Sequence, residues 1–566
     1  NTIVEVPYGA GLDGLFPATY AQPLNRIKWE IVEDKLIARM THERIQNSDH
    51  KGSKRTNDGT VVAMFAIESQ FDVKRAYNPG TGEELNIIEE NTSDRPWYDR
   101  EYIRVDWSRN MVTDGYQVDT LSQLGAFGSV KYSPVAYHVA DPNDPNRPLF
   151  DTDEGYFDVT QKVFASPELW DTPWGRLPAC FWSSPVANCN PTEVTLRLSF
   201  KKVVDRDYEP VEWNGKQMEA FGAFLEERFS YDRNFGLVDQ NWHRFAALHN
   251  VWEKSHIEGS QCGVDFWRDE KGEIAKYKAG PDGTLATDPK TGMPIPDPKG
   301  QPKAGTPVGV DPKRDTKTVA EGARNRILTP DDGWGTEDDC EFRDGGGQLL
   351  HKGAYCDLAT KKCALPRYER KIRTIPWYFG PEDKNDLFPS TARALNDWNI
   401  AVKYALVLGM KAEAERVGVR FDAAALGTDT ARISAILEDL DEDKIREDKA
   451  SAERERRVPA IADVFVMCHN PTVETDHPSC FKKGADGALK PIFGRIGDIR
   501  YNFVNLIEGP HSGGPWGIMV DAVDPLTGEK VAASVNEWVP ILDLVVQSNM
   551  DIMRWVNGEI TDEQIQ

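Results

Sequence analysis

The chain has 566 residues, of which 40% are hydrophobic and 28% charged, so it is long enough for about two to four domains with ordinary hydrophobic cores. Its formal net charge of −24 excludes nucleic acid and anionic membrane surfaces as partners, because both repel an acidic protein. No run approaches the roughly 20 apolar residues of a transmembrane helix. The first residue is Asn1 instead of Met and no signal peptide is recognisable, so we expect a processed product that is secreted, exposed on an outer membrane or periplasmic.

Residues 1–210 are predicted to form a β-rich N-terminal domain. Residues 27–32 alternate between apolar and polar side chains, and residues 61–67 are a continuous apolar run typical of a buried strand. The runs 71–77 and 85–88 flank the turn sequence 78–82, which predicts a hairpin. Further strand-like runs occupy residues 35–40, 102–107, 129–132, 155–159 and 193–200.

Two acidic loops of this domain offer the hard oxygen ligands that calcium prefers. The candidate ligands are Asp141, Asp144, Asp151 and Asp153. The alternative interpretation, which we favour, is that these loops are solvated turns.

Residues 211–261 are predicted to form a helical connector, because Phe221, Phe224, Leu225 and Phe229 fall on one helical face. Residues 262–366 change character and become rich in proline and glycine. Such a segment cannot pack a core, so we expect a surface insertion held by cysteines.

The eight cysteines predict disulfides in an oxidising compartment. Three close pairs are expected to bond, and the remaining two cysteines would close the insertion. The predicted pairs are Cys180 with Cys189, Cys356 with Cys363, Cys468 with Cys480, and Cys262 with Cys340. A rival hypothesis is a zinc site built from Cys468, His469, His477 and Cys480, but this spacing matches no standard zinc finger.

Residues 367–566 show the pattern of an α/β domain. Residues 371–379, 462–467 and the stretch 497–535 predict strands, the last closed as a hairpin by the turn at residues 524–528. A helix is expected from residue 388, with Pro389 in its first turn and a buried stripe of Leu395, Trp398, Val402, Ala405 and Leu406. The charged residues 434–457 are expected to form an exposed helical excursion.

A final helix is predicted to open at Pro540 and to stop at Gly558. Its expected inward residues are Ile541, Leu544, Val545, Ile552 and Trp555. Together with the strands, the two helices predict an α+β protein, in which the β-rich part precedes a mixed sheet with two long helices.

Four segments resemble large secreted or lipid-anchored bacterial zinc metalloproteases of the metzincin-like type. They are residues 94–109, the strand–helix unit with Trp398 and Asn399, Gly497-Asp-Ile-Arg-Tyr501, and Asp524-Pro-Leu-Thr-Gly-Glu529. The resemblance implies that residues 367–566 are part of a protease domain. It also implies an edge strand along which an extended peptide substrate lies, made of Ile518, Met519, Val520, Asp521, Ala522 and Val523.

The chain departs from this family at the zinc site. The family carries His-Glu-x-x-His on a helix, whereas here His42-Glu43 is followed by Arg-Ile-Gln and no other histidine precedes a glutamate. No catalytic residue is therefore named, no cofactor is expected within the chain, and the chain alone is expected to be inactive. Zinc would come only with a C-terminal portion absent from this sequence.

Uncovered helix faces predict a partner, either that C-terminal half or copies of the same chain. Two alternatives stay open. One is a non-catalytic relative that serves as a structural or binding component of the surface. The other is an unrelated β protein that binds protein or glycan, for which the 16 tryptophans are a weak argument.

Overall fold

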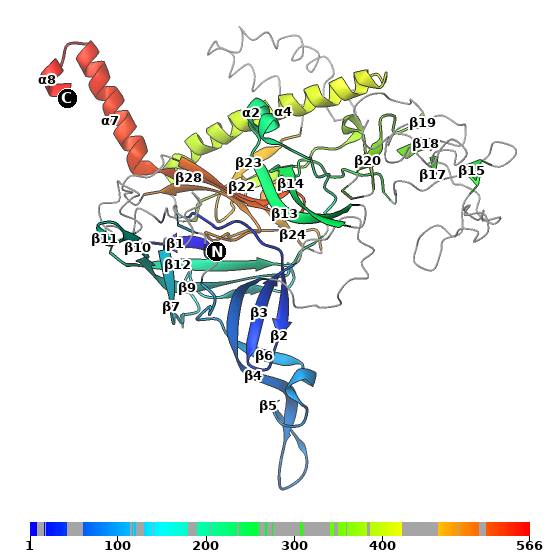
Figure 1. Ribbon diagram of the computed structural model, residues 1–566, viewed down its shortest axis with the longest axis vertical. Helices are drawn as coiled ribbons and strands as arrows, with labels where there is room; N and C mark the ends of the chain where they lie inside the picture. Colours follow the sequence, from blue (N-terminus) through cyan, green and yellow to red (C-terminus); the bar gives the residue numbers. More distant parts are fainter. Residues whose placement is uncertain are drawn as a thin grey trace.

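The structure is a computed structural model (Figure 1). It describes residues 1–7, 16, 19–41, 60–113, 116, 118–119, 130–139, 141–178, 190–204, 206–234, 237–258, 260, 267–268, 274–275, 306–308, 340–343, 349–357, 359–360, 362–381, 385–421, 462–484, 486–508 and 517–565. The predicted helical excursion at 434–457 lies outside these residues.

The N-terminal part is β-rich, as predicted, and is built from two five-stranded antiparallel sheets. The first has the order β1-β12-β9-β7, with β8 also paired to β9; its strands are β1 (Thr2–Glu5), β7 (Val130–Val135), β8 (Leu149–Asp151), β9 (Tyr156–Pro167) and β12 (Thr192–Lys201). The second has the order β2-β3-β4-β5, with β6 also on β4; its strands are β2 (Ile27–Ile31), β3 (Lys35–Met40), β4 (Val61–Tyr77), β5 (Glu84–Asn91) and β6 (Tyr102–Asp106). Both sheets contribute to one core, which includes Ile3, Phe65, Val163 and Leu196.

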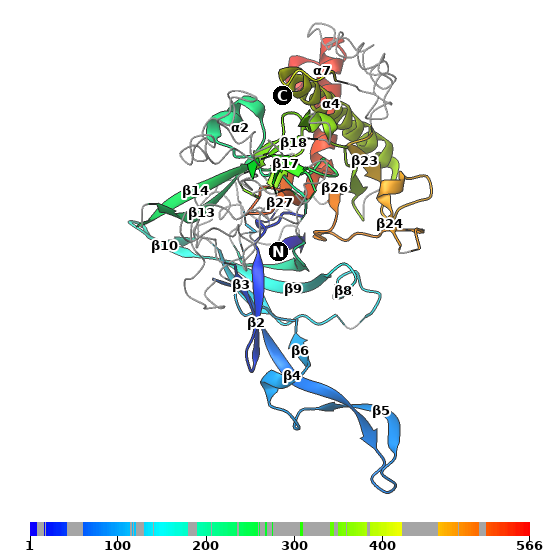
Figure 2. The same cartoon turned by 90° about the vertical axis from the view of Figure 1, so that its right-hand side faces the viewer.

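β4 joins two runs that the sequence predicted as separate strands. Its first part pairs with β3 and β6 beside the core, and its last residues pair with β5 across the predicted turn. The β4–β5 hairpin projects from the body of the molecule as an arm (Figures 1 and 2).

The helical connector predicted for residues 211–261 is wrong. Only the short helix α2 (Gly215–Phe221) forms, and Gly222, at φ 71°, ends it. The chain then folds into the hairpin of β13 (Leu225–Asn234) and β14 (Leu237–Ala246), in which ten residues pair with ten. Pairing between these two neighbouring strands outweighs the local helical pattern, because propensity is a weak prior.

Residues 367–566 form the predicted mixed sheet with two long helices. The strand order is β23-β22-β26-β28-β27, and every neighbouring pair is parallel except β28 with β27. The strands are β22 (Ile375–Phe379), β23 (Phe465–Cys468), β26 (Asn502–Ile507), β27 (Gly517–Val523) and β28 (Lys530–Trp538), and the helices are α4 (Phe388–Arg416) and α7 (Val539–Val556). The α+β class is confirmed. α4 begins with Pro389 in its first turn, and α7 is followed by Gly558 at φ 73°, both as predicted.

The buried face of α4 matches the predicted stripe only in part: Leu395, Val402 and Leu406 are half-buried and pack against the core, but the fully buried residues are others. Asn399, Ile400, Lys403 and Val407 are buried, whereas the side chain of Trp398 is 69% exposed. The reason is polar: the Asn399 side-chain oxygen accepts hydrogen bonds from the backbone N–H groups of residues 464 and 465 at 2.8 and 3.1 Å, and Lys403 forms an ion pair with Asp463. A search for apolar residues overlooks a face that is fixed by such contacts.

Two disulfides are defined. Cys468–Cys480 is confirmed, and it removes both thiols from the rival zinc hypothesis. Cys340 bonds to Cys363, so the predicted pairs Cys262–Cys340 and Cys356–Cys363 are wrong. Cys356 lies opposite Cys363 in the hairpin of β20 (Tyr355–Asp357) and β21 (Lys362–Ala364), but the segment that carries Cys340 packs on this hairpin and Cys340 forms the disulfide with Cys363. Cys356 is part of a different disulfide. Cys180 and Cys189 lie outside the described residues.

The remaining elements are short and mostly belong to the predicted insertion and the loops. They are β10 (Leu169–Thr172), β11 (Gly175–Pro178), β15 (Trp267–Arg268), β16 (Ile274–Ala275), β17 (Thr306–Val308), β18 (Glu341–Arg343), β19 (Leu349–Leu350), β20 (Tyr355–Asp357), β21 (Lys362–Ala364), β24 (Lys482–Lys483), β25 (Leu489–Lys490), η2 (Trp97–Asp99), η5 (Arg367–Glu369), η6 (Asn385–Leu387), η8 (Pro478–Cys480) and α8 (Asp562–Ile565).

Candidate functional site

The end strand of the C-terminal sheet is the candidate site. Among the strands that the structure describes, β27 pairs only with β28, from Gly517 opposite Glu537 to Val523 opposite Lys530. Its burial rises along the strand: Gly517 is exposed, the side chain of Met519 is 39% exposed and Val523 is buried. All six predicted edge residues, 518–523, lie on this strand. The edge strand thus forms where it was predicted, and the binding of peptide along it stays a prediction.

Contacts to β28 hold β27 in place. Lys530 Nζ lies 2.9 Å from Asp521 Oδ2, which neutralises this carboxylate. The buried Asn536 side chain donates to the Ile518 carbonyl at 3.3 Å, and its own oxygen accepts from Asn505 on β26 at 2.9 Å. Burial raises the pKa of Glu537. A Cβ at residue 517 would lie 2.7 Å from the carboxylate oxygens of Glu537, so any larger residue there would require the end of this side chain to shift.

The segment Gly497–Tyr501, which carries part of the family resemblance, connects the sheet to the β-rich part. Arg500 Nη1 lies 2.7 Å from Asp151 Oδ2 and 3.0 Å from Glu154 Oε2, and Arg500 Nη2 lies 2.7 Å from Asp498 Oδ2. Burial works against the charge of Arg500, but the hydrogen bond and the charge of Asp498 outweigh burial and raise the pKa of the guanidinium. Ser199 Oγ donates to the Gly497 carbonyl at 2.6 Å.

These contacts bear on the candidate calcium ligands. Asp151 is occupied by Arg500 and by Lys482, at 3.6 Å from the lysine. Asp141 and Asp144 accept hydrogen bonds from backbone N–H groups of their own turns at 2.8 and 2.7 Å. Asp153 is exposed. Within the described part of the chain, no group of three or more His, Cys, Asp or Glu side chains is placed to hold a metal ion.

A second junction contact is a buried cluster that sequence reasoning missed. Asp158 on β9 is completely buried and receives a hydrogen bond from Arg495, while Arg197 Nε on β12 lies 3.7 Å from it. Arg495 also donates to the carbonyls of residues 145 and 147 at 2.9 and 2.7 Å. Two arginines thus share one carboxylate between the β-rich part and the C-terminal sheet.

The turn Asp524–Glu529, the other motif of the resemblance, makes a third junction contact. Arg26 Nε donates to Asp524 Oδ1 at 2.9 Å and forms an ion pair with the same carboxylate. Arg206 Nη1 lies 3.4 Å from Glu529 Oε1. The two motifs therefore position the N-terminal part against the sheet.

Two histidines lie on the segment after β14, of which His256 is buried and His249 half-buried. His256 is held between Asp207 Oδ1, at 2.5 Å from Nδ1, and Asp357 Oδ2, at 3.0 Å from Nε2. Burial lowers the pKa of His256, but the hydrogen bonds to the two carboxylates raise it by more than burial lowers it, so the net shift is upward. Burial and the charge of Lys530 lower the pKa of His249 to about 3. Both histidines are enclosed by protein groups, which identifies them as structural.

The structure differs from the predicted inward face of the final helix, α7. Leu544, Ile552 and Trp555 are exposed, and none of the residues of α7 is buried. Ile541 and Val545 are half-buried. The helix points away from the sheet in Figure 1. Further exposed apolar side chains of α7 are Leu542, Val546, Met550, Met553 and Val556.

Within the residues that the structure describes, the arrangement offers a free strand edge and apolar helix surface for binding.

No helix in the described part of the chain is long and apolar enough to cross a membrane. Comparisons with protein-family models, with curated proteins and with solved structures each found no match to this chain.

Proposed function

We propose that residues 367–566 are the scaffold part of a metallopeptidase-like unit and that an extended peptide binds along β27. The single observation that supports this proposal is the position of β27 as the antiparallel end strand of an otherwise parallel sheet. Zinc and the group that activates water belong to a polypeptide segment outside this sequence, so the chain by itself supplies the floor of the peptide site but no hydrolysis.

The physical basis is β-strand addition. An end strand presents backbone N–H and C=O groups that a peptide can pair with, while alternate side chains confer selectivity. At about 3.3 Å per residue, residues 518–523 offer an edge of roughly 20 Å, which matches about six residues of extended peptide. Exposed Met519 lies near the start of this edge and favours an apolar side chain in the peptide. The fixed contacts of Asn536 and Lys530 keep the edge in place before peptide binds.

The disulfides support a location in an oxidising compartment, where a secreted or surface-exposed protein would meet peptide substrates.

A second candidate is a non-enzymatic surface protein that assembles with copies of itself or binds another protein. The exposed apolar side chains of α7 and of Trp398 favour this function, because contiguous apolar surface marks sites of protein contact. The two candidates differ in what happens at β27, since only the first requires peptide pairing there.

Hydrogen exchange provides the test. Peptides from a casein digest are added to the full chain, and amide exchange is followed by mass spectrometry. We expect slower exchange in residues 518–523 and no change in β5, which is also an end strand. An N-methylated version of the tightest peptide should fail to protect β27, because it lacks the donors that strand addition needs.

Unchanged exchange at residues 518–523 at saturating peptide would overturn the proposal. Added zinc should not make the isolated chain cleave these peptides. Zinc-dependent cleavage by the chain alone would contradict the assignment of zinc to another segment and would leave peptide binding intact.

A further inference from the structure

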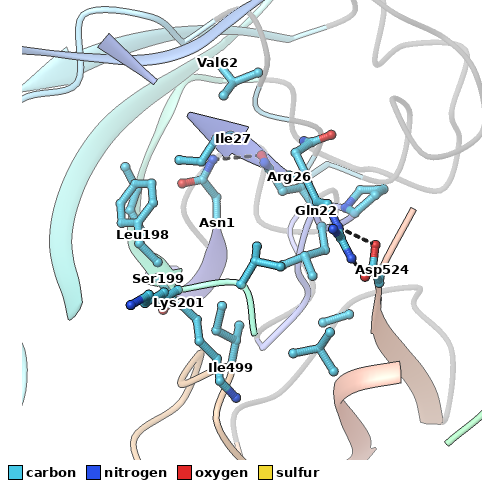
Figure 3. Close-up of a pocket in the computed structure, with 18 of the residues that line it drawn as sticks. Asn1, Gln22, Arg26, Ile27, Val62, Leu198, Ser199, Lys201, Ile499 and Asp524 are labelled. Carbon is cyan, nitrogen blue, oxygen red and sulfur yellow. Dashed lines mark hydrogen bonds and ion pairs between the residues drawn. The ribbon is translucent and has the colours of Figure 1, made fainter. Parts of the chain in front are cut away.

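A cavity of about 570 Å³ lies where the β-rich part meets the C-terminal sheet. Figure 3 shows Leu198, Ser199 and Lys201 on one side of it and the Arg26–Asp524 ion pair on the other. Several parts of the chain line it: residues 21–29, residues 198–204 with Arg206, and Ile499, Ala522, Asp524, Glu529 and Val531; residues 1–2, 62–63, 155 and 157 complete the lining. Its volume is in the range of cavities that bind small organic ligands.

The charge of the lining is opposite to that of the whole protein. Five basic and two acidic side chains line the cavity in a chain whose net charge is −24; they are Arg26, Lys28, Lys201, Lys202, Arg206, Asp524 and Glu529. Asp524 and Glu529 already pair with arginines of the lining. The remaining charge is positive, and it attracts an anion.

Lys201 is the natural anchor for such an anion. It is half-buried, and it forms no ion pair with any residue that the structure describes. Burial, followed by the charge of Arg206, lowers the pKa of Lys201 to about 8. The nearby carboxylates of Asp498 and Glu154 are engaged by Arg500. A partly desolvated ammonium group without a counterion gains free energy when an anion binds to it.

Another part of the lining, an aromatic wall made of Trp29, Phe157 and Phe200, is apolar. Trp29 and Phe200 have ring centroids 5.1 Å apart, and Phe157 stacks on Phe200 at 4.8 Å. All three residues line the cavity, and the side chain of Trp29 is 37% exposed. Leu198 and Ile499 add aliphatic surface. This wall favours an apolar body over a fully hydrated ion.

We propose that this cavity binds an amphipathic organic anion, with a carboxylate at Lys201 and an apolar chain against Trp29, Phe157 and Phe200. The site is separate from the free edge of β27 and does not depend on the function proposed there.

Calorimetric titration of the full chain with decanoate, below the concentration at which it forms micelles, tests the site. We expect saturable binding to the wild type and a loss of about tenfold or more in affinity for Lys201→Met, because the charge-assisted contact is removed. Lys131→Met is the matched control: Lys131 is exposed on β7, lies outside the cavity lining and changes the net charge equally. It should bind decanoate like the wild type.

A neutral detergent with the same ten-carbon tail, decanoyl-N-methylglucamide, distinguishes this site from apolar surface such as α7. It should not compete with decanoate at the Lys201-dependent site. Trp29→Ala should weaken decanoate binding while it leaves the net charge unchanged.

Binding should also weaken as pH rises from about 7 to about 9.5, because Lys201, which faces Asp498, Glu154, Arg206 and Arg500, loses its proton. Lys131→Met should show the same pH dependence. Absence of binding to the wild type, equal affinity in Lys201→Met, or displacement by the neutral detergent would each overturn the proposal.

Discussion

Removal of the charge of Asp158 is the sharpest test of how the two halves are joined. Asp158 is completely buried and is the carboxylate that Arg495 and Arg197 share. The substitution Asp158→Asn keeps the shape of the side chain and leaves two buried guanidinium groups without their counterion. Tyr156 Oη donates to Asp158 Oδ2 at 2.8 Å, and an asparagine oxygen can still accept this hydrogen bond.

The expected loss of unfolding free energy is about 3–5 kcal/mol, the range measured when one partner of a buried ion pair is removed. The matched control is Asp171→Asn on β10, whose partner Arg176 lies 3.3 Å away with both side chains mostly exposed. A solvent-exposed pair of this kind contributes about 0–1 kcal/mol. The two substitutions make the same chemical change and differ in burial.

Urea unfolding followed by circular dichroism measures both variants against the wild type. Combining Asp158→Asn with Arg495→Gln should recover part of the loss, since one of the orphaned charges is removed as well. A loss below about 1 kcal/mol for Asp158→Asn, equal to that of the control, would refute the view that this cluster stabilises the junction.

Four further outcomes are expected. His249 is half-buried and has a pKa of about 3 in the folded chain, so its stabilising contribution is complete above the unfolded pKa of about 6.5 and is lost as pH falls. In the His249→Phe variant, the urea midpoint should therefore change less between about pH 7 and 5 than in the wild type. The raised pKa of His256 has the opposite sign, so its contribution is complete below about pH 6.5 and is lost as pH rises through the folded pKa; His256→Asn should remove this alkaline loss in the same assay. Replacing Cys468 and Cys480 by alanine should lower the unfolding free energy by about 3 kcal/mol, because a 12-residue loop is no longer closed; no change in the urea midpoint would count against this. Leu544→Glu on exposed α7 should reduce the binding of a hydrophobic dye with little change in the urea midpoint, and a large drop in stability would mean that this side chain is buried.

Local signals in the sequence predicted the strands of the sheet. The alternation in residues 517–523 and 530–535, with the turn between them, depends only on neighbours along the chain, and the β27–β28 hairpin follows from it. The first turn of α4 and the stop after α7 were predicted because proline and glycine act within a few residues. The role of residues 518–523 as an edge did not follow from these signals, because only the resemblance to the protease family implied it; the structure has this strand at the end of the sheet.

Contacts between distant residues could not be predicted in this way. Arg495 and Asp158 are 337 residues apart, and nothing near either residue indicates the other. The same holds for Cys340, whose partner Cys363 was assigned to a closer cysteine. The hairpin at residues 225–246 is a different case. Its contacts are local, but the spacing of its apolar residues favours a helix, and the pairing of the two strands outweighs this spacing. The cavity is lined by segments that are far apart in the sequence, so no local motif predicts it.

The length of β4 has a geometric consequence. Its 17 residues form one strand, about 56 Å long at roughly 3.3 Å per residue, that begins in the core beside β3 and ends at the tip of the arm. Its pairing shifts register between Ile67 and Ser69 and between Arg75 and Tyr77, and such bulges bend a strand and increase its twist. The backbone that pairs with β3 therefore also anchors the arm, and the bulges set the direction in which the arm leaves the β-rich part.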